Sequence, residues 1–239
     1  MTAPYRDRID FISAYCDRWC ERCAFTTRCS AFAVTVATEM CDGDARAGLE
    51  LALGAPPPMT PEEDARRREF LAFFDDFDPT EAELDTIGRE EAARDERVDG
   101  HALVTACERF GLPAHAWLTA HRNIAASPKV AAAIEVMGWD AMLIQAKLRR
   151  ALHGLDGSRD HHGFEEDPLQ SDWNGSAKVA LISIARSIRA WDLAAEELHD
   201  EEAAAIAAEL RALEAAALKC FPDAWRFKRP GFDDPRVSQ

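Results

Sequence analysis

The sequence predicts an all-α protein, a single multi-helix domain of about seven to nine helices with an N-terminal four-cysteine metal-binding segment. Three observations support this fold class. Alanine, a strong helix former, is abundant, whereas Val, Ile and Thr, which favour strands, are comparatively few. Apolar residues recur at helical spacing, and helix-start signals that contain proline precede several of these stretches. The length of 239 residues suffices to bury a hydrophobic core without a metal or a disulfide.

Several short helices are expected in the N-terminal half. Apolar residues from Ile9 to Trp19 recur at helical spacing and predict a first helix that begins near residue 6 and carries the first cysteines. Thr60-Pro61 is typical of a helix start, since threonine can cap a helix and proline suits its first position. Gly111-Leu112-Pro113 should bend or break the chain. Residues 30–40 either continue the first helix or form a second one. The further helices expected here cover 42–53, 60–74, 78–99, 101–110 and 113–125.

Two long helices are expected at the centre of the fold. Ser127-Pro128 is a second cap-and-proline signal, and one apolar stripe then continues over residues 128–154. Residues 175–199 are apolar on nearly all sides, as expected of a helix that is buried on several faces. A last helix is expected over 201–218, followed by an irregular tail over 221–239.

The domain organisation follows from one strong break in the chain. Gly54 is followed by alanine and three prolines, a combination that no helix or strand continues through. We therefore expect a cysteine-rich N-terminal helical segment over 1–54 and a helical bundle body over 60–239. The two are expected to pack as one domain.

The charge of the chain excludes some classes of partner. Asp and Glu number 43 against 28 Lys and Arg, a net charge of −15, which repels phosphate backbones and anionic lipid. No secretory signal pattern and no long uncharged apolar stretch are visible. We therefore expect a cytoplasmic protein with no nucleic-acid partner and no membrane association. The sequence does not indicate the oligomeric state.

Four of the seven cysteines fall within fourteen residues. Cys16, Cys20, Cys23 and Cys29 form the pattern C-x3-C-x2-C-x5-C, and in a reducing compartment such clusters are typically metal ligands. Four thiolates suit either an iron–sulfur cluster or a tetrahedral zinc ion. Structural zinc sites usually combine two separated chelate pairs, so one short segment favours a 4Fe–4S cluster, with Zn²⁺ as the alternative. In the third interpretation, the cysteines are small buried hydrophobes.

Two family resemblances arise at these cysteines. The spacing Cys16-x3-Cys20-x2-Cys23 resembles the cluster motif of radical S-adenosylmethionine enzymes. The spacing Cys20-x2-Cys23-x5-Cys29 resembles the end of the cluster loop in helix-hairpin-helix DNA glycosylases. The chain has neither the strand succession of the first family nor the Gly-rich hairpin of the second. Each resemblance therefore implies a thiolate-ligated cluster and no particular reaction.

Two further groups of residues are candidate sites. Lys178, Arg186 and Arg189 lie on the predicted 175–199 helix, where they and the first backbone N–H groups could hold an anionic ligand. The loop over 156–173 is long for a compact domain and is predicted to form either a second metal site or a lid, unless it is only a mobile acidic loop. Its candidate residues are His161, His162, Glu165 and Asp167.

The leading functional hypothesis is an iron–sulfur helical protein with a redox, electron-transfer or sensing role, which could support an adjacent small-molecule site. Its expected partner is a redox partner protein or a small anionic ligand. One alternative is a zinc-stapled helical protein-interaction module. Another is a helical enzyme that acts on a small anionic substrate between the central helices. The sequence identifies no catalytic residue.

Overall fold

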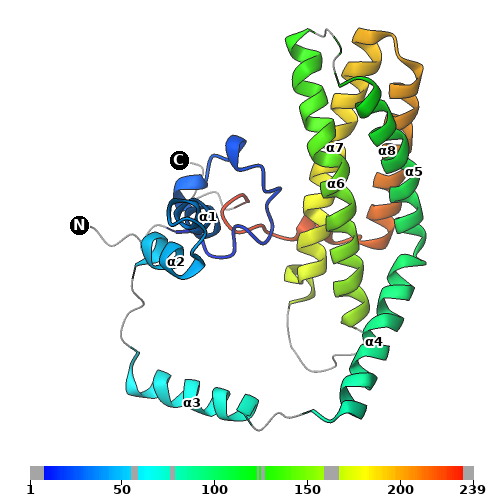
Figure 1. The fold of residues 1–239 in the computed structure, drawn as a ribbon. Helices are drawn as coiled ribbons and strands as arrows, with labels where there is room; N and C mark the ends of the chain where they lie inside the picture. The colour runs from blue at the N-terminus through cyan, green and yellow to red at the C-terminus, as the bar shows by residue number, and fades with distance from the viewer. Residues whose placement is uncertain are drawn as a thin grey trace. The chain divides into compact units, whose positions relative to one another are not determined.

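The structure confirms the all-α fold class. It is a computed structural model, whose described residues form eight α-helices and no strand (Figure 1). Contacts divide the chain into two compact units. The first comprises Met1–Ala14 and Arg18–Ala92, and the second Tyr15–Asp17 and Ala93–Gln239. The expected division into a segment over 1–54 and a body over 60–239, packed as one domain, stays a prediction. The described residues are 8–54, 59–75, 79–122, 124, 127–158 and 167–233.

The predicted first helix is wrong. The described residues before α1 form turns and two short 3₁₀ helices, η1 (Cys20–Arg22) and η2 (Thr26–Arg28). Phe11 and Arg18 have φ angles of 59° and 57°, which an α-helix does not accommodate. The backbone N–H of Ile9 donates to the carbonyl of Arg28 at 3.1 Å, so the chain folds back on itself here. The apolar residues at helical spacing thus serve separate packing contacts.

Helices α1 (Ser30–Met40) and α2 (Ala45–Leu53) pack against each other in the first unit. The Asp44 carboxylate caps α2 by accepting hydrogen bonds from two backbone N–H groups of its first turn. A β-carbon at Gly48 would lie 2.4 Å from the Thr38 hydroxyl oxygen, so only glycine allows this approach. Glycine at position 48 therefore sets the closeness of the two helices.

Two threonines begin the next two helices, as the sequence predicts for the first of them. Helix α3 (Pro61–Asp75) follows Thr60, and α4 (Glu81–Asp99) follows Thr80. Each threonine hydroxyl accepts from the backbone N–H three residues later. The backbone N–H of each threonine in turn donates to the side-chain carboxylate of the glutamate three residues later, Glu63 or Glu83, at 2.8 Å. These reciprocal pairs are capping boxes.

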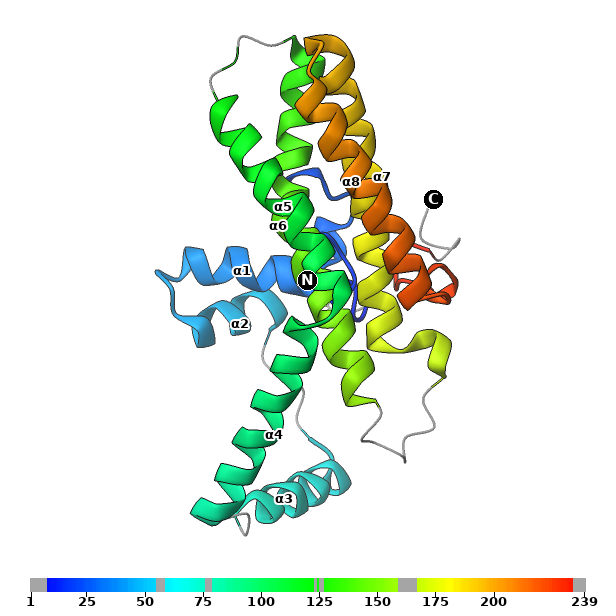
Figure 2. The ribbon, with the colours of Figure 1, turned by 90° about the vertical axis from the view of Figure 1, so that its right-hand side faces the viewer.

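Four helices form the bundle of the second unit (Figure 2). They are α5 (Ala102–Ala120), α6 (Pro128–Gly157), α7 (Asp172–Leu198) and α8 (Glu201–Cys220). Of the bend or break predicted at Gly111-Leu112-Pro113, the break is wrong, because α5 continues through Pro113. Packing of Phe110, Ala114 and Trp117, each at most 1% exposed, holds both sides of the proline in one helix and outweighs its intrinsic cost.

The two long helices predicted at the centre are adjacent in a ring of four helices, in which α5 and α8 also contact each other. Helix α6 contacts α5 and α7, and α7 contacts both α6 and α8. Their core side chains include Met137, Ile144, Leu181, Ile184 and Trp191, each fully buried. Small buried residues recur along α7 and α8 and let the backbones approach closely. They are Ala177, Ala180, Ala194, Ala203, Ala207 and Ala217.

Helix α7 begins earlier than predicted. Its cap is Ser171, whose hydroxyl accepts from the backbone N–H of Asn174. The N–H of Gly175 donates to the Ser171 carbonyl, so it is already used within the helix. The prediction that the first backbone N–H groups of a helix over 175–199 are open is therefore wrong, because the helix starts earlier and Ser171 supplies its cap.

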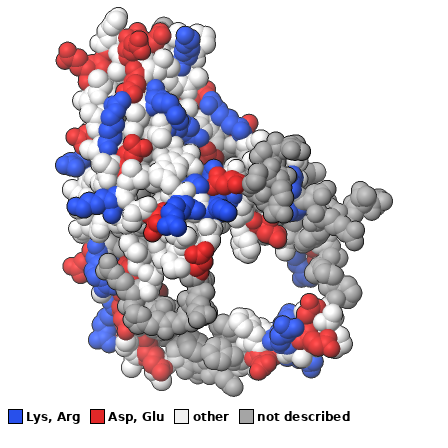
Figure 3. Space-filling model, turned by 180° about the vertical axis from the view of Figure 1, so that it is seen from behind, with Lys and Arg blue, Asp and Glu red and all other residues white. Residues whose placement is uncertain are grey.

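Charged side chains of both signs cover the surface of the bundle. Figure 3 shows Lys and Arg interspersed with Asp and Glu over one face. Within the second unit, Arg97 donates to Asp156 at 2.6 Å, and Arg149 pairs with Asp99, which ties the end of α4 to α6. In the described part of the chain, no helix has the length and apolarity needed to cross a membrane.

The polar groups buried along α7 give a test of this packing. The hydroxyls of Ser176, Ser183 and Ser187 are buried without a hydrogen-bond partner. Ser187→Ala should leave the free energy of unfolding unchanged or raise it, because no bond is lost. Ser171→Ala removes the cap of α7 and should lower the free energy of unfolding by about 1 kcal/mol. Urea denaturation of both variants measures the difference. A larger loss of unfolding free energy for Ser187→Ala than for Ser171→Ala would contradict the assignment of the Ser187 hydroxyl as unbonded.

Candidate functional site

Two of the four clustered cysteines have thiols that accept backbone hydrogen bonds. The N–H of Phe25 donates to Cys23 Sγ at 3.4 Å, and the N–H of Phe32 donates to Cys29 Sγ at 3.4 Å. Cys29 thereby caps α1. Its carbonyl also accepts from the Arg8 guanidinium at 3.1 Å. Backbone and side-chain contacts thus hold Cys29 in place.

Cys20 and Cys23 occupy opposite ends of one tight turn. Cys20 begins η1, and the N–H of Cys23 donates to the Cys20 carbonyl at 3.1 Å. Next to them, the guanidinium of Arg22 lies 4.1 Å from the ring centre of Trp19. Arg22 therefore stacks on an aromatic ring in this turn.

Cys16 lies in the three-residue segment Tyr15–Asp17, which belongs to the second unit. Both residues that flank it are fixed there. The Tyr15 hydroxyl donates to Asp172 at 3.2 Å, and Asp17 accepts from Arg186 at 2.7 Å. Cys16 is therefore held within the helical unit by its two neighbours.

The metal-binding prediction stays a prediction. All seven cysteines are thiols, and the four clustered ones are half-buried. Among the described residues, no three His, Cys, Asp or Glu side chains lie close enough together to hold a metal ion. Coordination by these cysteines would therefore require their side chains to converge as the ion or cluster binds, as is common where binding and folding are coupled.

Arg186 is the centre of a buried ion network. Its Nε and Nη2 donate to the two oxygens of Asp140 at 3.0 and 2.5 Å, and its Nη1 donates to Asp17. Asp140 is 0% exposed. Burial raises the pKa of Asp140, although the hydrogen bonds from Arg186 oppose that shift. Arg186 thus pairs with two carboxylates at once.

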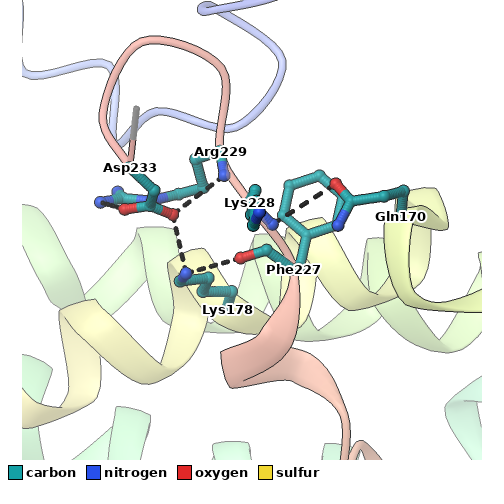
Figure 4. Close-up of polar contacts among 6 residues, drawn as sticks. All are labelled: Gln170, Lys178, Phe227, Lys228, Arg229 and Asp233. Carbon is teal, nitrogen blue, oxygen red and sulfur yellow. Dashed lines mark hydrogen bonds and ion pairs between the residues drawn. The ribbon is translucent and has the colours of Figure 1, made fainter. Parts of the chain in front are cut away.

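Lys178 is also engaged within the protein (Figure 4). Its ammonium group donates to the Phe227 carbonyl at 2.6 Å and to Asp233 at 2.7 Å. The guanidinium of Arg229 donates to the same carboxylate. Burial alone would raise the pKa of Asp233, but the hydrogen bonds from Arg229 and Lys178 lower it to about 2. These bonds fasten the C-terminal segment to α7.

The predicted anion site stays untested. Lys178 and Arg186 already have carboxylate partners, and Arg189 is exposed. An external anion would therefore compete with Asp233 for Lys178 and with Asp140 for Arg186. The structure adds no support for this site.

The second predicted metal or lid segment lies largely outside the described residues. His161, His162 and Glu165 are in that undescribed part. Asp167 is described, and its carboxylate accepts from the backbone N–H of Leu169 to cap the 3₁₀ helix η3 (Pro168–Gln170). Asp167 therefore has a local structural role.

Sequence reasoning missed the contacts that hold Tyr15 and Asp17. The signal that was available is a pair of opposite charges on two apolar helices, Asp140 within 128–154 and Arg186 within 175–199. Buried charges require partners, so such a pair predicts a contact between the helices. Nothing in the spacing of residues 15–17 indicates that they join this pair.

Comparison with protein-family models, curated proteins and solved structures finds no match.

The Lys178–Asp233 contact predicts a specific pH dependence of stability. Asp233 has a lowered pKa in the folded state, so its contribution is complete above the ordinary value of 3.8 and is lost as pH falls towards 2. Asp233→Asn should therefore lower the unfolding temperature at pH 7. The difference from the wild type should shrink below pH 4.

The matched control is Asp223→Asn. Asp223 lies in the same C-terminal segment and accepts from Arg226 in an exposed ion pair at 3.0 Å. Exposed pairs contribute little, so this variant should change the unfolding temperature much less. Equal effects of the two substitutions, or a difference for Asp233→Asn that does not vary with pH, would contradict the assignment.

Proposed function

We propose that this protein is an iron–sulfur protein with a redox, electron-transfer or sensing role, whose 4Fe–4S cluster is bound by Cys16, Cys20, Cys23 and Cys29. The observation that carries the proposal is the pattern C-x3-C-x2-C-x5-C, in which two thiols accept backbone hydrogen bonds. The proposal is made for the chemistry of this centre and not for a particular reaction.

The N–H···S bonds support a thiolate-ligated centre. Backbone donors at cluster sulfurs are among the features that set the reduction potential of an iron–sulfur cluster. Cys29 also lies at the positive end of α1, where a negatively charged sulfur is favoured. Both features suit the deprotonated thiols that metal coordination requires.

The spacing supports a cluster over a single zinc ion. Cluster motifs can place three ligands of one cluster on one short run of chain, as in the bacterial ferredoxin pattern, whose fourth cysteine binds a second cluster. Structural zinc more often closes two separated chelate pairs around one ion. The four cysteines fall within one stretch of fourteen residues. Cys16 enters this set on its spacing in the sequence alone, and zinc is kept as the alternative outcome of the test.

The role follows from what such a cluster can do. A 4Fe–4S cluster can accept one electron from a reductant and return it to an oxidant, which suits electron transfer to a redox partner protein. Loss or gain of the cluster can also report on oxidants or on iron supply. Burial raises the pKa of the Cys107 thiol to about 11, which disfavours its reactive thiolate form.

The decisive measurement is the iron, zinc and acid-labile sulfide content of anaerobically prepared protein. We expect about four iron and four sulfide per chain. The visible absorption band should bleach on reduction. One zinc per chain without sulfide would replace the cluster by the zinc alternative. Protein that holds neither metal after reconstitution would refute the proposed centre.

Cysteine variants assign the ligands. Cys23→Ser and Cys29→Ser should each lower the bound metal several-fold, because thiolate ligands are lost. Cys41→Ser is the matched control, since Cys41 is half-buried in the same unit and lies outside the motif. It should retain the wild-type metal content. Equal losses from all three variants would show that the motif is not the binding site.

A further inference from the structure

We propose that the second unit carries a recognition site for peptide segments of the form Tyr-x-Asp, and that the chain's own Tyr15–Asp17 occupies this site as an internal competitor. The site is formed by α6, α7 and the chain around Phe227. The inference goes beyond the proposed function, because none of the contacts that carry it involves a metal. It names the chemistry of a partner segment, which is an aromatic ring with a hydroxyl, one intervening residue and a carboxylate.

The site contacts the aspartate of the segment at two points. Arg186 donates to the Asp17 carboxylate at 2.7 Å, and the indole N–H of Trp139 donates to the Asp17 carbonyl at 2.9 Å. The first contact requires an acidic side chain, because a guanidinium pairs most strongly with a carboxylate. The second contact binds the backbone and fixes the direction of the segment whatever its sequence. Together they select a carboxylate at one position of a bound segment.

The tyrosine of the segment is contacted on its ring and on its hydroxyl. The ring centre of Tyr15 lies 4.6 Å from that of Phe227, and its hydroxyl donates to Asp172 at 3.2 Å. A β-carbon at Gly175 would come within 2.3 Å of the Tyr15 ring, so the ring fills the space that glycine leaves. A phenylalanine would lose the hydrogen bond, and an aliphatic side chain would also lose the ring contact. The site therefore favours tyrosine at this position.

The two charged groups of the site are held by residues outside the segment. Arg186 is oriented by two hydrogen bonds to the buried Asp140. Asp172 accepts from Arg150 at 2.7 Å. A site whose groups are already ordered loses little conformational entropy when a segment binds. Because these supports lie within the second unit, a segment of another molecule can use the same contacts.

The chain's own segment occupies the site at a cost. The residues on both sides of it, up to Ala14 and from Arg18, belong to the first unit. Arg18 has a φ angle of 57°, in the left-handed region that is unfavourable for a residue with a β-carbon. A separate peptide need not adopt this backbone, so it can compete with the internal segment despite the high effective concentration of the latter. Binding of a partner would displace Tyr15–Asp17.

The test measures binding of a fluorescent peptide to the full-length chain by fluorescence anisotropy. The peptide has the sequence of residues 10–20, with Cys16→Ser and Cys20→Ser to prevent disulfide formation. The receptor is the double variant Tyr15→Ala/Asp17→Ala, whose own segment lacks both side chains that the site contacts. We expect saturable binding to this variant. Binding to the wild type should be at least about 10-fold weaker, because the internal segment competes.

Substitutions in the peptide test the specificity of the site without altering the protein. Asp17→Asn in the peptide removes the charge that pairs with Arg186 and should weaken binding about 10-fold. Asp10→Asn is the matched control, since it makes the same change outside the Tyr-x-Asp motif, and this peptide should bind like the unmodified one. Equal affinities of the Asp17→Asn and Asp10→Asn peptides, or no saturable binding to the double variant, would overturn the proposal.

A second receptor covers the case in which the double variant does not fold. Tyr15→Phe keeps the ring and removes only the hydroxyl that donates to Asp172, so the internal segment should be displaced more easily and the peptide should bind more tightly than to the wild type. Unchanged affinity would overturn the proposal. Sedimentation of the wild type tests the other occupant. A dimer that dissociates when the peptide is added would assign the site to a second copy of the chain and overturn a separate partner.

Discussion

The burial of the Asp140 carboxylate makes its partner indispensable. A charge removed from water costs several kcal/mol unless it is paired and hydrogen-bonded. Arg186 supplies the opposite charge and donates a hydrogen bond to each oxygen of Asp140. Because Asp140 belongs to α6 and Arg186 to α7, the pair fixes how the two central helices face each other. The same guanidinium also holds Asp17, so the setting of residues 15–17 depends on the pairing of α6 with α7.

Packing along α7 shows what accompanies this polar contact. Alanines and serines on its buried face allow close approach to its neighbours, and glycine at position 175 leaves room for an aromatic ring. The cost is several buried hydroxyl groups without partners. The helical unit therefore combines tight backbone packing with a few strong polar contacts, and these contacts attach its non-helical segments, Tyr15–Asp17 and the C-terminal residues up to 233.

The sequence predicted the helices with strong local signals. Ser127-Pro128 and the long apolar stripe predicted α6, and the all-round apolar character of 175–199 predicted a central α7. It failed where long-range contacts decide. The apolar residues before Trp19 have helical spacing, but Tyr15 packs on Gly175, whose position in space no local pattern reveals. Pro113 remains inside α5 because the core on both sides of it outweighs its local cost.

The candidate site could be predicted only as a set of residue types. Clustered cysteines are visible in the sequence, whereas the hydrogen bonds to two of their sulfurs depend on the turns that η1, η2 and α1 create. Lys178 and Arg186 were recognised as charges on an apolar helix, but their partners are far away in the chain. Charge alone does not distinguish a ligand site from an internal ion pair.

The Asp140–Arg186 pair also constrains how this sequence can evolve. Loss of either residue alone leaves a buried, uncompensated charge, a change that commonly costs about 3–5 kcal/mol. Replacing both by apolar residues of similar size can be nearly neutral for the two helices, yet it would leave Asp17 without its arginine. Across related sequences, positions 140 and 186 should therefore change together. Where they become apolar, position 17 should no longer be restricted to an acidic residue.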